Sequence, residues 1–567
     1  MLASSKFSRV RERLGPLPLI NHFADRLGLD DLLERFIPTS RDPRQKMPPA
    51  TALGVLLRSI LVEREPVYRQ SETVLAFAPR VFRISEEQIK ALNDDNVGRA
   101  LDRLFAADRA ALLTAAAVAA QTRFGLSLKE VHNDSTSIRF CGQYQEAKGR
   151  SIRGKKAPWI TYGFSKDHRG DLKQLLLTLT GTRDGMIPVH VRCDDGNTSD
   201  STTHLETWEA LRALHGSEKF LYVADSKLCN GETMEAIHAR GGKFITVLPR
   251  TRKEDKRFRE WIQNNEPPWE TVWDRPNPRK KYGPRDVWKV YKAIAPSKEN
   301  WTIIWVFSTL LRENQRQRRE DQIARAIQEL EKLKAKLEGP RPRLRSEAQI
   351  QERIWKIVTR LHVRDYVRAW VAPEELSRFR QDRPGRPGPD TRYRRTVKRR
   401  YTIGFEVDRL AVEYDMRSDG AYPLLCNDDT LSPREILEAH KRQAGIERRF
   451  RQLKSVFELA PVFLKNEGRI VALFTLYFLA MLLQALMERE IRNSMQKAGI
   501  KSLPLYPEER ESKLPTASTV FRIFSLIDRE TILSDSHELA VFEPELTELQ
   551  LQLLDLLNVP RSSYVPG

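Results

Sequence analysis

The sequence predicts an α/β protein with a mixed sheet, which a large insertion of strands and a helical hairpin interrupts. Three observations support this class. Residues 1–125 carry apolar side chains at helical spacing, residues 126–250 alternate strand and helix patterns, and residues 251–410 break that alternation with Trp-rich and basic segments. The 567 residues are too many for one core and predict about three or four domains.

The first 125 residues are expected to form an all-α domain. We expect helices at 17–36 and 50–63, each ended by a following proline, and a long third helix at 97–123. Its capping cluster is Asn93, Asp94 and Asp95. Such a domain could read DNA in a groove with its arginines, or serve dimerisation, and the sequence leaves both open. The arginines are Arg58, Arg64 and Arg69.

The next part predicts strand, strand, strand, helix, strand, helix and strand, which is an α/β order. The expected strands are 128–140, 159–180, 186–195, 219–227 and 243–249, the first three as an antiparallel meander, with helices at 201–214 and 232–239. A carboxylate at the end of a central strand faces the crevice where ligands bind in such sheets. Asp134 and Asp225 are both so placed.

The insertion begins with six tryptophans, most of which we expect in a core, and with strand candidates WKVYKAI and WTIIWVF. Two apolar stripes around Gly339-Pro340 then predict a helical hairpin. Residues 378–400 hold ten Arg or Lys against two Asp, and their Pro and Gly predict a loop. We expect nucleic-acid contact there, with a solvated linker as the alternative. The contact candidates are Arg394, Arg395, Lys398, Arg399 and Arg400. Residues 403–416 look strand-like.

Residues 430–457 predict an amphipathic helix with a Ser432–Glu435 capping box. Its apolar stripe is Ile436, Ala439, Ile446, Phe450, Leu453 and Phe457. Glu447 lies at the edge of this stripe, with Arg448, Arg449, Arg451 and Lys454 close by. A carboxylate at a buried seam, ringed by cations, suits a metal ligand beside a phosphate path. A solvated helix with an ordinary Glu–Arg pair is the alternative.

Charge points to a polyanionic partner. The chain has 96 Lys and Arg against 76 Asp and Glu, a net charge of +20 and a pI near 9.7, which favours nucleic acid. Residues 470–487 are apolar enough to raise the question of a membrane span, but we expect a buried helix and no membrane. Four scattered cysteines argue against zinc and disulfides and favour a reducing, cytoplasmic location.

Two carboxylates on strands and one on a helix are what a two-metal phosphoryl-transfer site needs. The candidates are Asp134, Asp225 and Glu447, and no phosphate-binding loop or nucleophile elbow competes with them. Spacing alone is not specific, however. Asp194, Asp195 and Asp200 could serve similarly, or could form a turn and a helix start.

Several motifs resemble those of DDE transposases of bacterial insertion sequences, over nearly the whole chain and in the same order. They are HNDSTS at Asp134, WITYGFSKDHRGDLKQ, DGNTSDSTTH, YVADSK at Asp225 and HKRQAGIERRFRQLK at Glu447. The subgroup resembled has a helical N-terminal domain and a large insertion between the second Asp and the Glu. The resemblance implies a ribonuclease H-like core in which Asp134, Asp225 and Glu447 are catalytic and bind two Mg²⁺ or Mn²⁺ ions. It also implies cut-and-paste transposition, with nicking followed by attack of a 3′-hydroxyl on target DNA.

The family signature around the Glu is Tyr-x2-Arg-x3-Glu-x6-Lys, and here those places hold His440, Gln443, Glu447 and Lys454. The last two match. By resemblance, cations near the Glu contact DNA phosphates, and the candidates are Lys441, Arg442, Arg448, Arg451 and Lys454. The implied partners are double-stranded DNA, as terminal inverted repeats and target, and a second copy of the chain in a synaptic complex.

The resulting division of the chain is 1–125, DNA-binding or dimerisation domain; 126–250, first part of the catalytic core; 251–410, insertion; 411–495, second part of the core with the Glu helix; 496–567, helical C-terminal region. Two other functions stay open. One is a nuclease of the same fold that only cuts, and the other is an inactive or domesticated transposase that binds DNA.

Overall fold

The computed structural model describes residues 7–37, 47–63, 66–140, 142, 144, 147–164, 169–216, 219–277, 282–339, 342–456, 464, 466–534 and 537–565. The chain divides into two units, Met1–Thr246 with Glu438–Gly567, and Val247–Leu437. All three candidate catalytic carboxylates belong to the first unit. Residues 411–437 belong to the second unit.

The first unit is built on a mixed sheet in the order β6-β5-β2-β7-β8. Its strands are β2 (Glu130–Phe140), β5 (Lys173–Thr182), β6 (Pro188–Asp194), β7 (Leu221–Ala224) and β8 (Lys243–Val247). Strand β5 runs antiparallel to β2 and β6, whereas β7 is parallel to both β2 and β8. Helices α8 (Asp200–His215) and α9 (Gly231–Ala239) make the connections into β7 and β8. Parallel neighbours require such crossovers. This order confirms the predicted meander and ribonuclease H-like mixed sheet, although the strand expected at 159–180 begins only at Lys173.

Helices precede this sheet, with two departures from the predicted boundaries. They are α1 (Leu17–Leu27), α2 (Leu29–Phe36), α3 (Pro49–Val62), α4 (Gln70–Leu75), α5 (Glu86–Ile89), α6 (Asp94–Ala106) and α7 (Arg109–Phe124). The expected single helix at 17–36 is broken at Gly28, which adopts φ +70° and ends α1. The expected long third helix is broken before Arg109, because the Asp108 side chain caps a new helix there. Asn93 caps α6, as predicted.

The helical segments pack around α16 (Glu467–Lys497). This helix is long and apolar enough to cross a membrane, but 94% of its most apolar window is buried within the protein, as expected. The C-terminal region is not purely helical. Besides α17 (Ala517–Phe524) and α18 (Glu548–Leu557) it contains β15 (Asp528–Ser534) and β16 (His537–Phe542). Strand β15 pairs with β1 (Phe7–Arg13) from the N-terminal region, which is therefore not all-α.

The second unit has a sheet in the order β14-β11-β10-β9 and a helical hairpin. Its elements are α10 (Lys253–Trp261), β9 (Glu270–Arg275), β10 (Asp286–Lys292), β11 (Thr302–Ser308), α11 (Thr309–Glu338), α12 (Glu347–Arg360), β12 (Val367–Gln381), β13 (Tyr393–Val407), α13 (Arg409–Ser418) and β14 (Ala421–Cys426). The predicted strands and helical hairpin are confirmed. Of the six tryptophans, Trp288, Trp301 and Trp305 are buried, whereas Trp261, Trp269 and Trp273 are partly exposed, so half rather than most of them are core residues.

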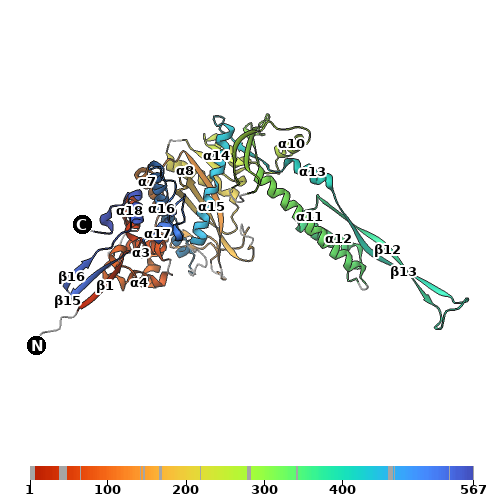
Figure 1. Cartoon of the computed structure of the whole chain (residues 1–567), viewed down its shortest axis with the longest axis horizontal. Coiled ribbons are helices and arrows are strands. Elements are labelled where there is room, and N and C mark those ends of the chain that lie inside the picture. Colours follow the sequence, from red (N-terminus) through yellow and green to blue (C-terminus); the bar gives the residue numbers. More distant parts are fainter. Residues whose placement is uncertain are drawn as a thin grey trace. The chain divides into compact units, whose positions relative to one another are not determined.

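Two predictions for this unit are wrong. The basic stretch 378–400 is not a loop, since most of it forms the ends of β12 and β13, a two-stranded ribbon that runs past the α11–α12 hairpin (Figure 1). Pro and Gly are confined to the turn at its tip. Residues 403–416 are strand only to Val407, because the Asp408 side chain accepts a hydrogen bond from the Ala411 amide and starts α13.

Candidate active site

Strands β2 and β7 bring the first two carboxylates together. Asn133 pairs with Ala224 in parallel register, and Asp134 and Asp225 are the residues that follow them. Neighbouring strands lie about 4.8 Å apart, so the two side chains leave the sheet side by side. Both residues are partly exposed. The structure therefore places this predicted pair at one point on the sheet.

Each of these carboxylates is oriented by a nearby backbone amide. Ser135 N–H donates to Asp134 Oδ1 at 2.7 Å, and Lys227 N–H donates to Asp225 Oδ1 at 3.0 Å. The second contact belongs to a short 3₁₀ turn, Ser226–Leu228, in which Asp225 is the capping residue. Short-range hydrogen bonds of this kind help to orient a carboxylate.

A buried polar layer lies on the opposite face of the same strands. Thr180 Oγ1 donates to Asn133 Oδ1 at 2.8 Å, and the Tyr222 hydroxyl lies 3.0 Å from His204 Nδ1. Burial raises the pKa of Tyr222, and the charges of Asp225 and Asp134 raise it further, so the phenol stays neutral. The sequence did not reveal this layer, although Asn133, His204 and Tyr222 lie within the HNDSTS, DGNTSDSTTH and YVADSK motifs.

The helix predicted at 430–457 is two helices, α14 (Pro433–Arg442) and α15 (Ala444–Arg451), followed by a π-helical turn, Gln452–Val456. The capping box is confirmed, since Ser432 N–H donates to Glu435 and Glu435 N–H donates to Ser432 Oγ. The stripe residues from Ile436 to Leu453 are buried, and Phe457 lies outside the described residues. The break falls at Gln443, whose backbone lies between the two helices.

Residues at this break connect the Glu-bearing helix to β2. Arg442 forms a bidentate pair with Glu130 at 2.6 and 2.8 Å, and Gln443 Nε2 donates to the Asn133 carbonyl at 3.2 Å. Alternate residues of a strand face the same side, so Glu130 and Asp134 share a face. Helix α15 packs on β2 and β5. The helix thus covers the face from which Asp134 projects.

Glu447 lies on the exposed side of α15. Within the described part of the chain, no group of three or more His, Cys, Asp or Glu side chains is close enough to hold a metal ion. The structure brings Asp134 and Asp225 together and places Glu447 on the helix over that face, without forming a preassembled trio of carboxylates.

The surroundings of the break depress the pKa of nearby groups. Desolvation, helped by the charge of Lys441, lowers the pKa of His440 to about 4, so this imidazole is neutral at pH 7. His132 is fully buried 2.9 Å from Glu130, and desolvation lowers its pKa too. Hydrogen bonds from His132 and Arg442 outweigh burial and hold the pKa of Glu130 at about 2. A neutral His440 contributes no positive charge to phosphate binding.

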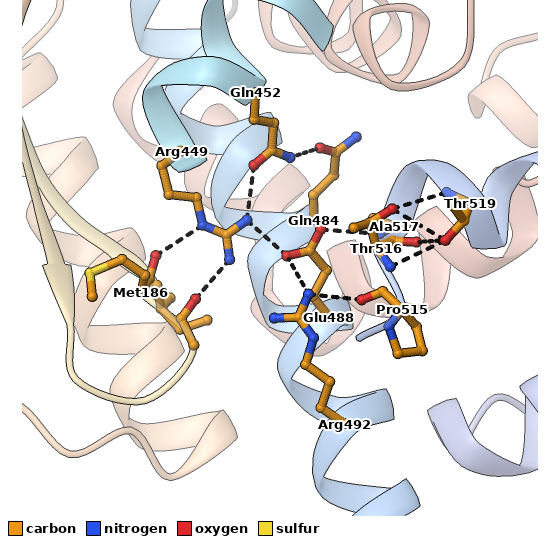
Figure 2. Close-up of polar contacts among 12 residues, drawn as sticks. Met186, Arg449, Gln452, Gln484, Glu488, Arg492, Pro515, Thr516, Ala517 and Thr519 are labelled. Carbon is orange, nitrogen blue, oxygen red and sulfur yellow. Dashed lines mark hydrogen bonds and ion pairs between the residues drawn. The ribbon is translucent and has the colours of Figure 1, made fainter. Parts of the chain in front are cut away.

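Arg449 anchors α15 from within the core (Figure 2). Its guanidinium donates to the carbonyls of Met186 and Gly185 at 3.1 and 2.8 Å and pairs with Glu488 of α16 at 2.9 Å. Glu488 also accepts from the Ala517 amide at 3.1 Å. The sequence pattern places Arg449 among the cations around Glu447, but only 5% of this residue is exposed. It is a structural residue two positions from Glu447.

The other predicted DNA contacts differ in their surroundings. Arg448 and Arg451 are exposed, and Lys441 and Lys454 are partly exposed. Arg442 already has a carboxylate partner in Glu130, so it has a structural role, and its contact with DNA stays a prediction. Arg394, Arg395, Lys398, Arg399 and Arg400 lie on β13 of the second unit. In the N-terminal helices, Arg58 is buried and bonded to Asp30, which removes it as a groove reader, and Arg64 lies outside the described residues.

The alternative carboxylates have structural partners. Asp194, at the end of β6, is bonded to Arg192 at 2.7 Å, and Asp195 Oδ1 accepts from the Trp159 amide at 2.7 Å. Asp200 is the first residue of α8. The turn and helix start that the sequence allowed for this segment is therefore what the structure contains.

Two carboxylates thus lie on adjacent strands, and the helix that covers their face carries a third. The family model described as "Transposase DDE domain" matches residues 130–483, which include Asp134, Asp225 and Glu447. The chain belongs to this family of DDE transposases. Residues 10–118 match a domain of unknown function, DUF4277.

This chain also resembles chains of known structure. A cryo-EM structure of a piggyBac transposase synaptic complex with hairpin DNA is similar at 10% identity and a TM-score of 0.27. The likeness covers 53% of this chain and 63% of that one. No curated protein matches this chain.

Proposed function

We propose that this chain is an active transposase that cuts DNA at the ends of a bacterial insertion sequence and joins those ends to target DNA. The observation that carries the proposal is that Asp134 and Asp225 directly follow the paired residues Asn133 and Ala224 of β2 and β7, in a chain of the DDE family. The face they share lies under the helix of Glu447.

The donor set suits a hard divalent cation. Asp134, Asp225 and Glu447 would supply carboxylate oxygens, which Mg²⁺ and Mn²⁺ prefer as ligands. Two bound ions would activate the attacking oxygen and stabilise the leaving one. Asp134 and Asp225 are already oriented by backbone amides, so little rearrangement is needed to hold an ion between them.

We assign DNA binding and positioning of the Glu447 helix to charged and polar residues on or next to that helix. Arg448, Arg451, Lys441 and Lys454 would contact DNA phosphates beside the carboxylates, since they lie on or next to the helix of Glu447. Gln443 and Arg442 hold that helix on β2 and so position Glu447. We further propose a homodimer during reaction, because two transposon ends are processed together, and a cytoplasmic location.

The test uses the full chain with a duplex that carries the inverted repeats flanking its gene and a plasmid target, with and without Mg²⁺. The proposal expects nicks at the repeat ends and joined products, both requiring the metal. Nicks without joined products would support the nuclease alternative. Binding without nicks would support the inactive, DNA-binding alternative, and absence of binding to any DNA would overturn the proposal.

A further inference from the structure

The β12–β13 ribbon has two chemically different faces. The strands pair without interruption from Val367 opposite Val407 to Gln381 opposite Tyr393. Residues directly opposite each other lie on the same face, and successive residues alternate. The register therefore assigns every side chain of this long basic ribbon to one face or the other.

In the half of the ribbon nearest its tip, one face is almost entirely cationic. We call it the cationic face, and it consists of Arg378, Arg380, Arg394 and Lys398, with Leu376 and Thr396 between them. All four cations are exposed. Across the described residues, none of the four forms an ion pair with a carboxylate. A cluster of uncompensated positive charge on a protein surface attracts a polyanion.

The other face of the same half is apolar and aromatic. This aromatic face contains Phe379, Tyr393, Val397, Arg395 and Arg399. Its two cations are partly satisfied within the ribbon: Arg395 Nε donates to Ser377 Oγ at 3.0 Å, and Arg399 stands opposite Glu375. The two faces thus differ strongly in available charge although their residues are adjacent in sequence.

The base of the ribbon is fixed to the helical hairpin. Val367 and Ile403 are buried in a cluster with residues of α11 and α12, and Thr402 donates to Glu338 at 2.9 Å. Arg400 lies near this base, and its Nε and Nη2 atoms are shielded from solvent. The base therefore supports the ribbon, and the tip half is the part able to reach a ligand.

We propose that the cationic face of this ribbon lies in the major groove of double-stranded DNA, with its four cations on the phosphates that border the groove. The proposal rests on the proposed function, which supplies DNA as the partner. The major groove is about 12 Å wide and admits a two-stranded ribbon, whereas the minor groove of undeformed DNA is about 6 Å wide. The aromatic face is then directed away from the bases.

The experiment compares two matched double variants of the full chain, R394Q/K398Q on the cationic face and R395Q/R399Q on the aromatic face. Each removes two positive charges from the same six-residue stretch of β13, residues 394–399. Affinity for a duplex carrying the terminal repeats, and for a scrambled duplex, is measured over a range of salt concentrations, and circular dichroism checks that both variants fold.

We expect R394Q/K398Q to lose about tenfold or more in affinity for both duplexes at low salt and to flatten the slope of log K against log salt by about 1.8, since each phosphate contact contributes about 0.9. R395Q/R399Q should lose less than about threefold. Equal losses, or a larger loss in R395Q/R399Q, would overturn the assignment of the face. Failure of the wild type to bind either duplex would instead overturn the proposed function.

A second measurement tests the groove. Guanine N7 lies in the major groove, so its methylation should interfere with binding by the wild type. At the same guanines, the wild type should protect N7 from methylation and R394Q/K398Q should not. Competition by the minor-groove ligand distamycin together with indifference to N7 methylation would overturn the major-groove placement.

Discussion

Asp134 and Asp225 occupy matching positions on neighbouring parallel strands, one residue beyond the paired Asn133 and Ala224. Two carboxylates held this close repel each other unless a cation lies between them. They are separated by about 90 residues in sequence, yet the register between β2 and β7 fixes their positions relative to each other. Any slip of β7 by one residue would turn Asp225 to the opposite face of the sheet.

Close backbone packing at Gly196 should make this position intolerant of a side chain. A Cβ there would lie 2.6 Å from the Thr161 carbonyl oxygen and closer still to that of Gln174, and neither backbone can move easily. Gly196→Ala should therefore lower the melting temperature by several degrees, as overpacking typically costs about 1–3 kcal/mol.

Gly170→Ala is the matched control for Gly196→Ala, because nothing lies within 4 Å of its added Cβ. Thermal unfolding followed by circular dichroism compares the two. Similar melting temperatures for both variants would refute the close approach of the 159–163 segment to Gly196.

The Arg449–Glu488 pair should be worth more than any exposed pair near the site. Arg449→Met leaves the carboxylate of Glu488 without its main partner in a buried setting, which typically costs about 3–5 kcal/mol. Chemical denaturation should show that loss, and adding Glu488→Met to Arg449→Met should recover part of it.

Arg448→Met is the control, since it removes the same charge from the exposed side of the same helix and should change stability by less than about 0.5 kcal/mol. If Arg449→Met unfolded like Arg448→Met, the buried pair would not anchor α15.

Stability should fall as the pH drops below about 6.5. The folded pKa of His440 is about 4, and that of His132 is also lowered, so the unfolded chain binds these protons more tightly. The neutral imidazoles therefore stabilise the folded chain fully above the unfolded pKa of about 6.5. For His440, this contribution to the free energy of unfolding is lost as the pH falls towards 4, by up to about 1.4 kcal/mol per pH unit.

Denaturation midpoints between pH 7.5 and 4.5 test this pH dependence. His440→Gln should flatten the profile, and His238→Gln, at an exposed position on α9, should leave it unchanged. A profile that His440→Gln does not alter would mean that the imidazole titrates normally.

The sequence predicts best where burial imposes a period. The stripe of α14 and α15 is packed against a core, so its apolar spacing reveals the helical segment that carries Glu447. The register that joins Asp134 to Asp225 is a long-range pairing, and no local pattern contains it. Their proximity therefore needed the structure.

Sequence-based prediction fails where a local cap or turn interrupts the apolar period, or where solvent exposure removes it. Gly28 and Asp108 each interrupt a continuous apolar pattern, one by a left-handed backbone and the other by a side-chain cap. The β12–β13 ribbon has both faces of its tip in solvent, so its strands show no alternation between buried and exposed residues. Arg449 resembles its exposed neighbours in sequence, and only its partner on α16 distinguishes it.

The most direct test of the proposed active site is to measure metal-dependent nicking at the repeat ends. The wild type is compared with Asp134→Asn, Asp225→Asn and Glu447→Gln, and Asp195→Asn serves as the control. Asn at position 195 keeps an acceptor for the Trp159 amide, so this control should nick like the wild type. We expect Asp134→Asn, Asp225→Asn and Glu447→Gln to bind end DNA as the wild type does and to lose nicking by at least about a hundredfold. Normal nicking by Asp134→Asn or Asp225→Asn would contradict the role of the paired aspartates.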